Sequence, residues 1–124
     1  MTKSSWGEFM NKIALFPFRD DMMCFIHVLL NAQDMKDKGH EVTVVMEGAA
    51  VALLPKLAQP DNPMHELFNA VRNKGLIEGA CRACSSKLKV AADIESLGIP
   101  LIGDMSNHPA MASYIERGYE IITF

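Results

Sequence analysis

Two cysteines that stand three positions apart are the residues best suited to chemistry in this chain. They lie in the segment 81–86, which reads Cys-Arg-Ala-Cys-Ser-Ser and follows an apolar run that predicts a short strand. A short helix is predicted next, so Cys81 would meet unpaired backbone N–H groups and the positive end of a helix dipole. Both favour the thiolate, the nucleophilic form of cysteine, and the neighbouring cation of Arg82 acts in the same direction. Sulfur or redox chemistry at Cys81 is one interpretation, and packing as a small buried residue is the other.

The C-x-x-C spacing of Cys81 and Cys84 admits two further interpretations. A zinc site would need more ligands, but a second C-x-x-C pair is absent and only Cys24 and scattered histidines could complete it. The sequence therefore predicts neither a metal nor a cofactor. A dithiol–disulfide couple of the thioredoxin type stays open, although the aromatic residue before the pair and the Gly-Pro between the cysteines are missing.

Polar residues that end other predicted strands are candidates to support Cys81. In an open parallel sheet, ligands bind beyond the carboxyl ends of the strands. From this edge we single out Ser85, Glu47 and His108 as supporting residues, and His108 could transfer a proton near neutral pH. Capping of a helix or loop is the alternative for Glu47 and His108, and it is the favoured interpretation for Asp104.

Several common catalytic motifs are absent. The chain holds no G-x-G-x-x-G, no G-x-x-x-x-G-K-[ST] and no G-x-S-x-G, so dinucleotide, P-loop and serine-hydrolase chemistry lose their main support. His65 and Glu66 begin like a zinc-protease H-E-x-x-H motif, but Asn69 replaces the second histidine.

The composition is that of an average globular domain. The chain has 124 residues, of which 49% are apolar and 22% charged, with a net charge of -3, and these values exclude collagen-like and disordered classes. Lys and Arg occur without a basic run, so no nucleic-acid partner is expected. The longest apolar stretch, residues 22–30, is far shorter than the roughly 20 residues of a membrane span. An odd number of cysteines and the lack of a secretory signal predict a cytoplasmic protein without structural disulfides.

Strand and helix patterns alternate along the chain. Apolar or β-branched runs predict strands at 12–16, 41–46, 76–80, 99–103 and 119–124, with helical patterns between them. This alternation requires a parallel sheet covered by helices on both faces. We therefore predict an α/β fold, a three-layer α/β/α sandwich with a mostly parallel five-stranded sheet. Residues 1–9 would form an N-terminal tail and residues 10–124 a single domain.

The order of these motifs resembles the DsrE/DsrF-like family over roughly residues 11–124. The resemblance rests on Glu47-Gly48 after the second strand, on Ala80-Cys81 followed by Leu-Lys-Val-Ala at 88–91, and on the ending from residue 98 to 124. It implies a flavodoxin-like domain that assembles as a homo-oligomer, often a trimer or hexamer. In characterised members, including the DsrE and TusD sulfur-relay subunits, a cysteine after the third strand carries a persulfide. Cys81 matches that cysteine, Cys84 has no assignable counterpart, and Lys89 stands where a glycine is common.

Three functions are consistent with these observations. The leading hypothesis is a sulfur carrier or sulfurtransferase that accepts sulfane sulfur on Cys81 and passes it to a thiol of a partner protein. A non-catalytic oligomeric module that binds a small ligand or a protein at the strand ends is the second. The third is a thiol–disulfide oxidoreductase that needs both Cys81 and Cys84, and in the carrier Cys84 could act as a resolving thiol.

Overall fold

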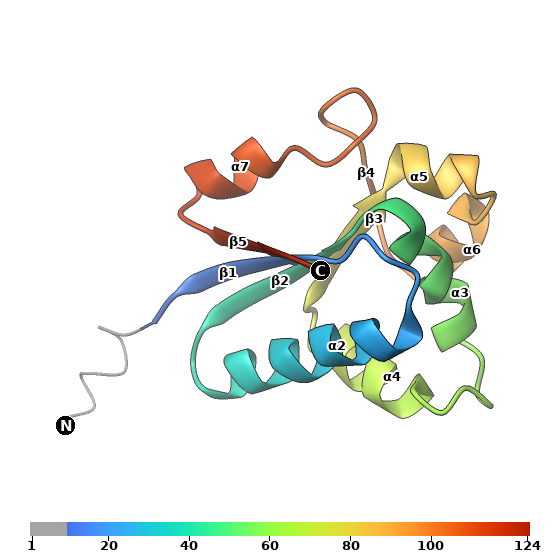
Figure 1. Ribbon diagram of the computed structural model, residues 1–124, viewed down its shortest axis with the longest axis horizontal. Coiled ribbons are helices and arrows are strands. Elements are labelled where there is room, and N and C mark those ends of the chain that lie inside the picture. The colour runs from blue at the N-terminus through green and yellow to red at the C-terminus, as the bar shows by residue number, and fades with distance from the viewer. Residues whose placement is uncertain (1–9) are drawn as a thin grey trace.

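A computed structural model describes residues 10–124, so the predicted N-terminal tail, residues 1–9, lies outside the described residues. Strands and helices alternate from one end of the described chain to the other, and each predicted strand is present (Figure 1). The strands are β1 Lys12–Phe16, β2 Glu41–Met46, β3 Ile77–Cys81, β4 Leu101–Ile102 and β5 Glu120–Thr123. The helices are α2 Met22–Asp37, the 3-10 helix η1 Gly48–Ala52, α3 Leu53–Leu57, α4 His65–Asn73, α5 Arg82–Lys87, α6 Ala91–Ser96 and α7 Met111–Glu116.

All five strands pair in parallel, in the order β4-β3-β2-β1-β5, which confirms the predicted α/β class. Flavodoxin itself has the order 2-1-3-4-5, so this chain shares the layers but orders its strands differently. From β1 to β4 the chain moves across the sheet in one direction, and right-handed crossovers then place the intervening helices on one face. Because β5 returns to the far side of β1, α7 is the one helix among residues 10–124 that lies on the opposite face, as Figure 1 shows.

The two faces of the sheet bury very different amounts of apolar surface. Under α2, α3, α4 and α6 lies a large core that includes Phe25, Leu29, Phe68 and Ile94, each at most 2% exposed. Under α7 the buried set is small, and Tyr114 is its only helical member. The large core therefore fixes the sheet on one side, while α7 covers the other side thinly.

The strand ends that face the candidate site are tied together by backbone hydrogen bonds. The N–H of Glu47, just after β2, donates to the carbonyl of Pro17 at 3.0 Å, and the N–H of Ala50 donates to the carbonyl of Phe18 at 3.2 Å. Gly48 lies between them with a φ of +53°, and a Cβ there would stand 3.0 Å from the Phe18 carbonyl oxygen. Glycine is the residue that tolerates both conditions, so Gly48 lets Glu47 end β2 beside the chain that leaves β1.

None of the helices within residues 10–124 combines the length and the apolar character that a membrane crossing requires. The sequence predicts the same, because its longest apolar stretch is too short.

The end of α5 explains why a glycine would suit position 89. The N–H of Val90 donates to the carbonyl of Ser85 at 2.9 Å and the N–H of Lys89 to that of Ser86 at 3.1 Å, which is the hydrogen-bond pattern of a Schellman motif. Lys89 accordingly has a φ of +61°, in the left-handed region.

Replacing Lys89 with glycine is expected to stabilise the protein by about 0.5–1 kcal/mol. Relief of the left-handed strain contributes about 1–2 kcal/mol. Part of this gain is cancelled, because glycine loses more conformational entropy than lysine when the chain folds. Chemical denaturation of the wild type and Lys89→Gly measures the difference. Lys87→Gly, two residues earlier in α5, is the matched control and is expected to destabilise by roughly 0.5–1 kcal/mol. Equal losses in the two variants would contradict the strain at position 89.

Candidate active site

Cys81 is at once the last residue of β3 and the N-cap of α5, as the sequence predicts. Its Sγ accepts a hydrogen bond from the backbone N–H of Cys84 at 3.4 Å. The residue has no exposed surface. The strand–helix junction therefore holds the thiol in a fixed place, but inside the protein.

A tight turn after β4 covers this junction. Met105 and His108 form a backbone pair in which each N–H donates to the other's carbonyl at 2.8 Å. The two residues between them, Ser106 and Asn107, have φ values of +49° and +69°, and a two-residue loop with both φ values positive is a type I′ turn. The carbonyl of Asn107 in turn accepts the backbone N–H of Ala83 at 2.8 Å, in the first turn of α5. The turn thus satisfies an otherwise free N–H group of this helix.

This turn brings His108 against Cys81. The Nδ1 atom of His108 lies 3.2 Å from Sγ of Cys81, and the carbonyl oxygen of Asn107 lies 3.8 Å from the same sulfur. At 3.2 Å a proton can pass between the thiol and the imidazole, because the two atoms are already a hydrogen-bonded pair. The structure therefore joins two of the residues that the sequence singles out, although 27 positions separate them.

Glu47 and Cys84 complete a cluster of four. Their side chains, with those of Cys81 and His108, each offer one donor atom, and all four atoms lie within 4.8 Å of one another. Glu47 is 6% exposed. Burial raises the pKa of its carboxyl group, while a hydrogen bond from the Cys81 thiol and the charge of His108 act in the opposite direction. Two thiols, an imidazole and a carboxyl group therefore share one small volume.

Of the two interpretations that the sequence leaves open for Cys81, a reactive thiolate or a buried thiol, the structure favours the buried thiol in the resting state. Burial raises the pKa of the Cys81 thiol to about 12, and the nearby Cys84 thiol and Glu47 carboxylate act in the same direction. The N–H of Cys84 lowers this pKa, as the sequence argument requires, but its effect is smaller than that of burial. Removing the sulfur from water therefore outweighs the favourable helix N-terminus.

The other predicted supporting residues have different partners. The guanidinium of Arg82 is exposed and donates to the carbonyl of Leu101 in the edge strand β4 at 3.3 Å. Ser85 is fully buried, and its hydroxyl has no hydrogen-bond partner within residues 10–124. Asp104 binds the start of α7: its carboxylate accepts the N–H of the N-cap residue Ala110 at 3.0 Å and the hydroxyl of Ser113 at 3.1 Å, which fits the structural role favoured from the sequence.

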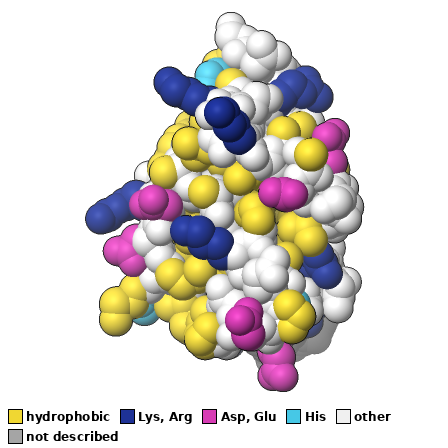
Figure 2. Space-filling model, turned by 90° about the vertical axis from the view of Figure 1, so that its right-hand side faces the viewer, with side chains coloured by type: hydrophobic (Ala, Val, Ile, Leu, Met, Phe, Trp, Pro, Cys, Tyr) yellow, Lys and Arg dark blue, Asp and Glu magenta, His cyan; other side chains and the backbone are white. Residues whose placement is uncertain are grey.

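Cys84 connects the buried cluster with the surface. It is half-buried and lines a shallow hollow of about 210 Å³ together with Gly48, Ala49, Lys87 and Leu88. Figure 2 shows the side of the molecule that carries α5 and α6, on which apolar side chains are widespread and charged side chains of both signs lie among and around them. Leu88 at this hollow is 43% exposed. The hollow therefore gives a partner molecule an apolar route to Cys84, with the basic side chain of Lys87 beside it.

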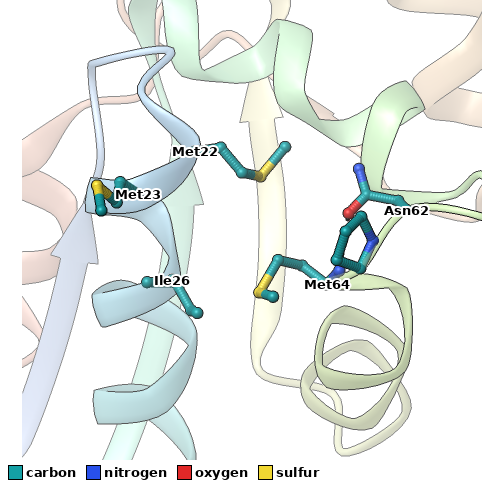
Figure 3. Close-up of a pocket in the computed structure, with 6 residues that line it drawn as sticks. Met22, Met23, Ile26, Asn62 and Met64 are labelled. Carbon is teal, nitrogen blue, oxygen red and sulfur yellow. Dashed lines mark hydrogen bonds between the residues drawn. The ribbon is translucent and has the colours of Figure 1, made fainter.

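A second, larger hollow was not predicted. It has a volume of about 420 Å³ and lies between the start of α2 and the chain that leads into α4 (Figure 3). Met22, Met23, Ile26 and Met64 supply most of its apolar lining. Met23 at this hollow is 79% exposed. The adjacent pair Met22-Met23, directly after the cap residue Asp21, is the sequence signal for an exposed methionine here. Neighbouring positions of a helix point in different directions, so the two side chains do not both face the core.

Comparisons with known proteins agree with this architecture. A family model described as the DsrE/DsrF-like family matches residues 23–124. An uncharacterized protein of Methanocaldococcus jannaschii, MJ0733, is 29% identical over 121 residues, which cover 94% of this chain and 97% of that protein. An uncharacterized protein of Archaeoglobus fulgidus is 35% identical over 48 residues, which cover 39% of this chain and 79% of that protein.

One solved structure has the same fold. It is a conserved protein of unknown function from Bacteroides thetaiotaomicron, BT1422, with a TM-score of 0.71 and 22% sequence identity, and the match covers 92% of this chain and 95% of that one. At this identity the similarity establishes the fold alone.

The burial of Cys81 predicts an order of thiol reactivity. In the reduced, folded protein we expect iodoacetamide to alkylate half-buried Cys84 and Cys24 at least tenfold faster than Cys81, because the reagent cannot reach a sulfur with no exposed surface. Peptide mass spectrometry at timed intervals measures the three rates, and the denatured protein, in which all three should react alike, is the control. Labelling of Cys81 as fast as Cys84 in the folded protein would contradict the buried position.

Proposed function

This chain belongs to the DsrE/DsrF-like family, and we propose that it is a cytoplasmic sulfur carrier of the sulfur-relay type that accepts sulfane sulfur as a persulfide on Cys81. Family membership supports a role related to sulfur relay. The observation that carries the finer proposal is the 3.2 Å contact between Sγ of Cys81 and Nδ1 of His108. It gives the cysteine that matches the family's persulfide position a base within direct reach.

The transfer step needs no cofactor. Sγ of Cys81 attacks the outer, sulfane sulfur of a donor persulfide while its proton moves to Nδ1 of His108. A new S–S bond forms on Cys81 as the S–S bond of the donor breaks, and the donor leaves as a thiolate that regains the proton. Donor persulfide and Cys81 thiol thus become donor thiol and Cys81 persulfide, with no net oxidation. An acceptor thiol on a partner protein removes the sulfur by the same reaction in reverse.

The donor must first gain access to a buried sulfur. Cys81 is covered by the type I′ turn at 105–108, whose central residues Ser106 and Asn107 are both exposed. We propose that this turn moves aside when a donor or acceptor docks. A carrier that is closed at rest would protect its persulfide from unrelated thiols, since exchange requires access to the sulfur.

Cys84 suits the role of resolving thiol. Its sulfur lies within 4.8 Å of the Cys81 sulfur and faces the hollow beside η1. Attack of the Cys84 thiol on Sγ of the Cys81 persulfide would form a Cys81–Cys84 disulfide and release hydrogen sulfide. A persulfide that no acceptor collects would thereby be removed.

The thinly covered face of the sheet supports the proposal of a homo-oligomer. The single described helix on this face, α7, leaves Ile115 61% exposed. Ile102, Met111 and Ile121 on the same face are only partly buried. Large apolar side chains that stay accessible on one face favour an interface between subunits. A trimer or hexamer, as the family resemblance implies, would cover this face.

Mass spectrometry of the intact protein tests the sulfur proposal. The reduced protein is freed of metal with a chelator, exposed to a persulfide donor and compared with Cys81→Ala and with Cys24→Ser, the matched thiol control. We expect a gain of one or more sulfur atoms in the wild type and in Cys24→Ser and no gain in Cys81→Ala. Spraying the same samples under native conditions also reports the number of subunits.

Three other outcomes of the mass experiment would contradict this proposal. An equal gain in Cys81→Ala would overturn the assignment to Cys81. No gain in any protein, under conditions that load a known carrier, would favour the binding module. A loss of two hydrogens that requires both Cys81 and Cys84 would favour the thiol–disulfide oxidoreductase.

A further inference from the structure

We propose that Glu47, Cys81, Cys84 and His108 together bind a zinc ion. The sequence analysis predicts no metal. The inference does not depend on sulfur transfer, because it rests on the donor atoms alone.

The geometry of the four side chains fits a tetrahedral ion. With bonds of about 2.0–2.3 Å, the ligand atoms of a zinc site lie about 3.3–3.8 Å apart. The Cys81 Sγ and His108 Nδ1 atoms are 3.2 Å apart, and every pair in the cluster is within 4.8 Å. Side-chain rotations that shift each atom by a fraction of an ångström would close the site around an ion.

The buried carboxyl group of Glu47 also favours a cation in the cluster. Glu47 is buried, yet the ion pairs formed within residues 10–124 are Lys38–Asp34, Lys74–Asp37 and Arg117–Glu78, and none includes it. Arg82, the nearest cation in sequence to Cys81, is exposed and bonded to a carbonyl of β4 instead. Buried carboxylates are usually paired with a cation or coordinated to a metal. A divalent ion would offset two of the three negative charges that this carboxylate and two thiolates carry when they coordinate it.

The types of donor atom select the metal. Two thiolates, an imidazole and one carboxylate are a soft to borderline set that zinc prefers in four-coordinate sites. Calcium and magnesium require six or more oxygen ligands, which this cluster does not supply. Coordination would displace the protons of the two thiols into solvent.

The site would be built by three strand ends. Glu47 follows β2, Cys81 and Cys84 flank the junction of β3 and α5, and His108 lies on the turn after β4. Only the C-x-x-C half is visible in the sequence, because the parallel sheet brings the other two ligands from 34 positions before Cys81 and 27 after it. A bound ion would tie these segments together and would hold the turn closed over Cys81.

Cobalt is a suitable probe, because it replaces zinc and its spectrum reports the ligands. The full chain, reduced with a phosphine and stripped of metal, is titrated with Co²⁺ without oxygen. We expect saturation at one ion per chain, a thiolate-to-cobalt charge-transfer band and the intense visible bands of four-coordinate cobalt. Added Zn²⁺ should remove all of these bands.

Variants test each ligand class. Cys84→Ser, His108→Ala and Glu47→Gln are expected to weaken Co²⁺ binding by about 100-fold or more, since even outer-shell partners of a metal are worth roughly 10–100-fold. Cys24→Ser and His27→Ala, which change a thiol and an exposed imidazole outside the cluster, should bind as the wild type does. Circular dichroism confirms that each variant is folded, and Glu47→Gln, which keeps the shape of the side chain, serves if a larger change unfolds the protein.

The inference is overturned if the wild type shows no thiolate-to-cobalt band, or if the spectrum survives unchanged in folded Cys84→Ser, His108→Ala and Glu47→Gln. A failure of sulfur loading in the mass experiment leaves this result untouched, because that experiment is performed on metal-free protein. The two proposals can therefore fail separately.

Discussion

The contact between the Cys81 sulfur and His108 Nδ1 is the constraint on which the site depends. It requires β3 to end at Cys81, α5 to begin at the next residue and the turn after β4 to fold back over both. The type I′ turn achieves this with two left-handed residues, and the carbonyl of Asn107 anchors it to the first turn of α5. The parallel order of the sheet places these carboxyl ends, and Glu47 from β2, at one edge.

Two physical effects compete at Cys81, and their magnitudes decide its resting state. The first turn of a helix favours an anion, but this helix has six residues and one of its free N–H groups already bonds to Asn107. Complete burial penalises the same anion, and the negative charge of Glu47 adds to the penalty. Burial therefore determines the resting state, and Cys81 is a protected thiol that has a base beside it. A carrier of reactive sulfur gains from such a state, because the thiol becomes a nucleophile only when its partner is in place.

The sequence was sufficient to predict the positions of the buried strands, but not the burial and the contacts of the site residues. Apolar runs of five or six residues located β1, β2 and β3 to within one residue, because these strands are buried on both faces. At the sheet edge the prediction was poorer: the strand expected at 99–103 has only Leu101 and Ile102 in it, since Pro100 cannot donate to a neighbour. The position of Cys81 was predicted, but its burial was only one of two interpretations, because burial depends on the turn at 105–108, which is distant in sequence. His108 was named as a candidate without its partner, since contact across the sheet leaves no local pattern.

The rate of sulfur transfer in His108→Ala tests the central claim most directly. With metal-free protein and a persulfide donor in excess, stopped-flow mixing and rapid alkylation give the rate at which Cys81 gains sulfur. If His108 accepts the thiol proton at 3.2 Å, its loss should lower this rate by about 100-fold, the lower range for a general base, while His27→Ala reacts as the wild type does. A folded His108→Ala protein that gains sulfur at the wild-type rate would contradict the account.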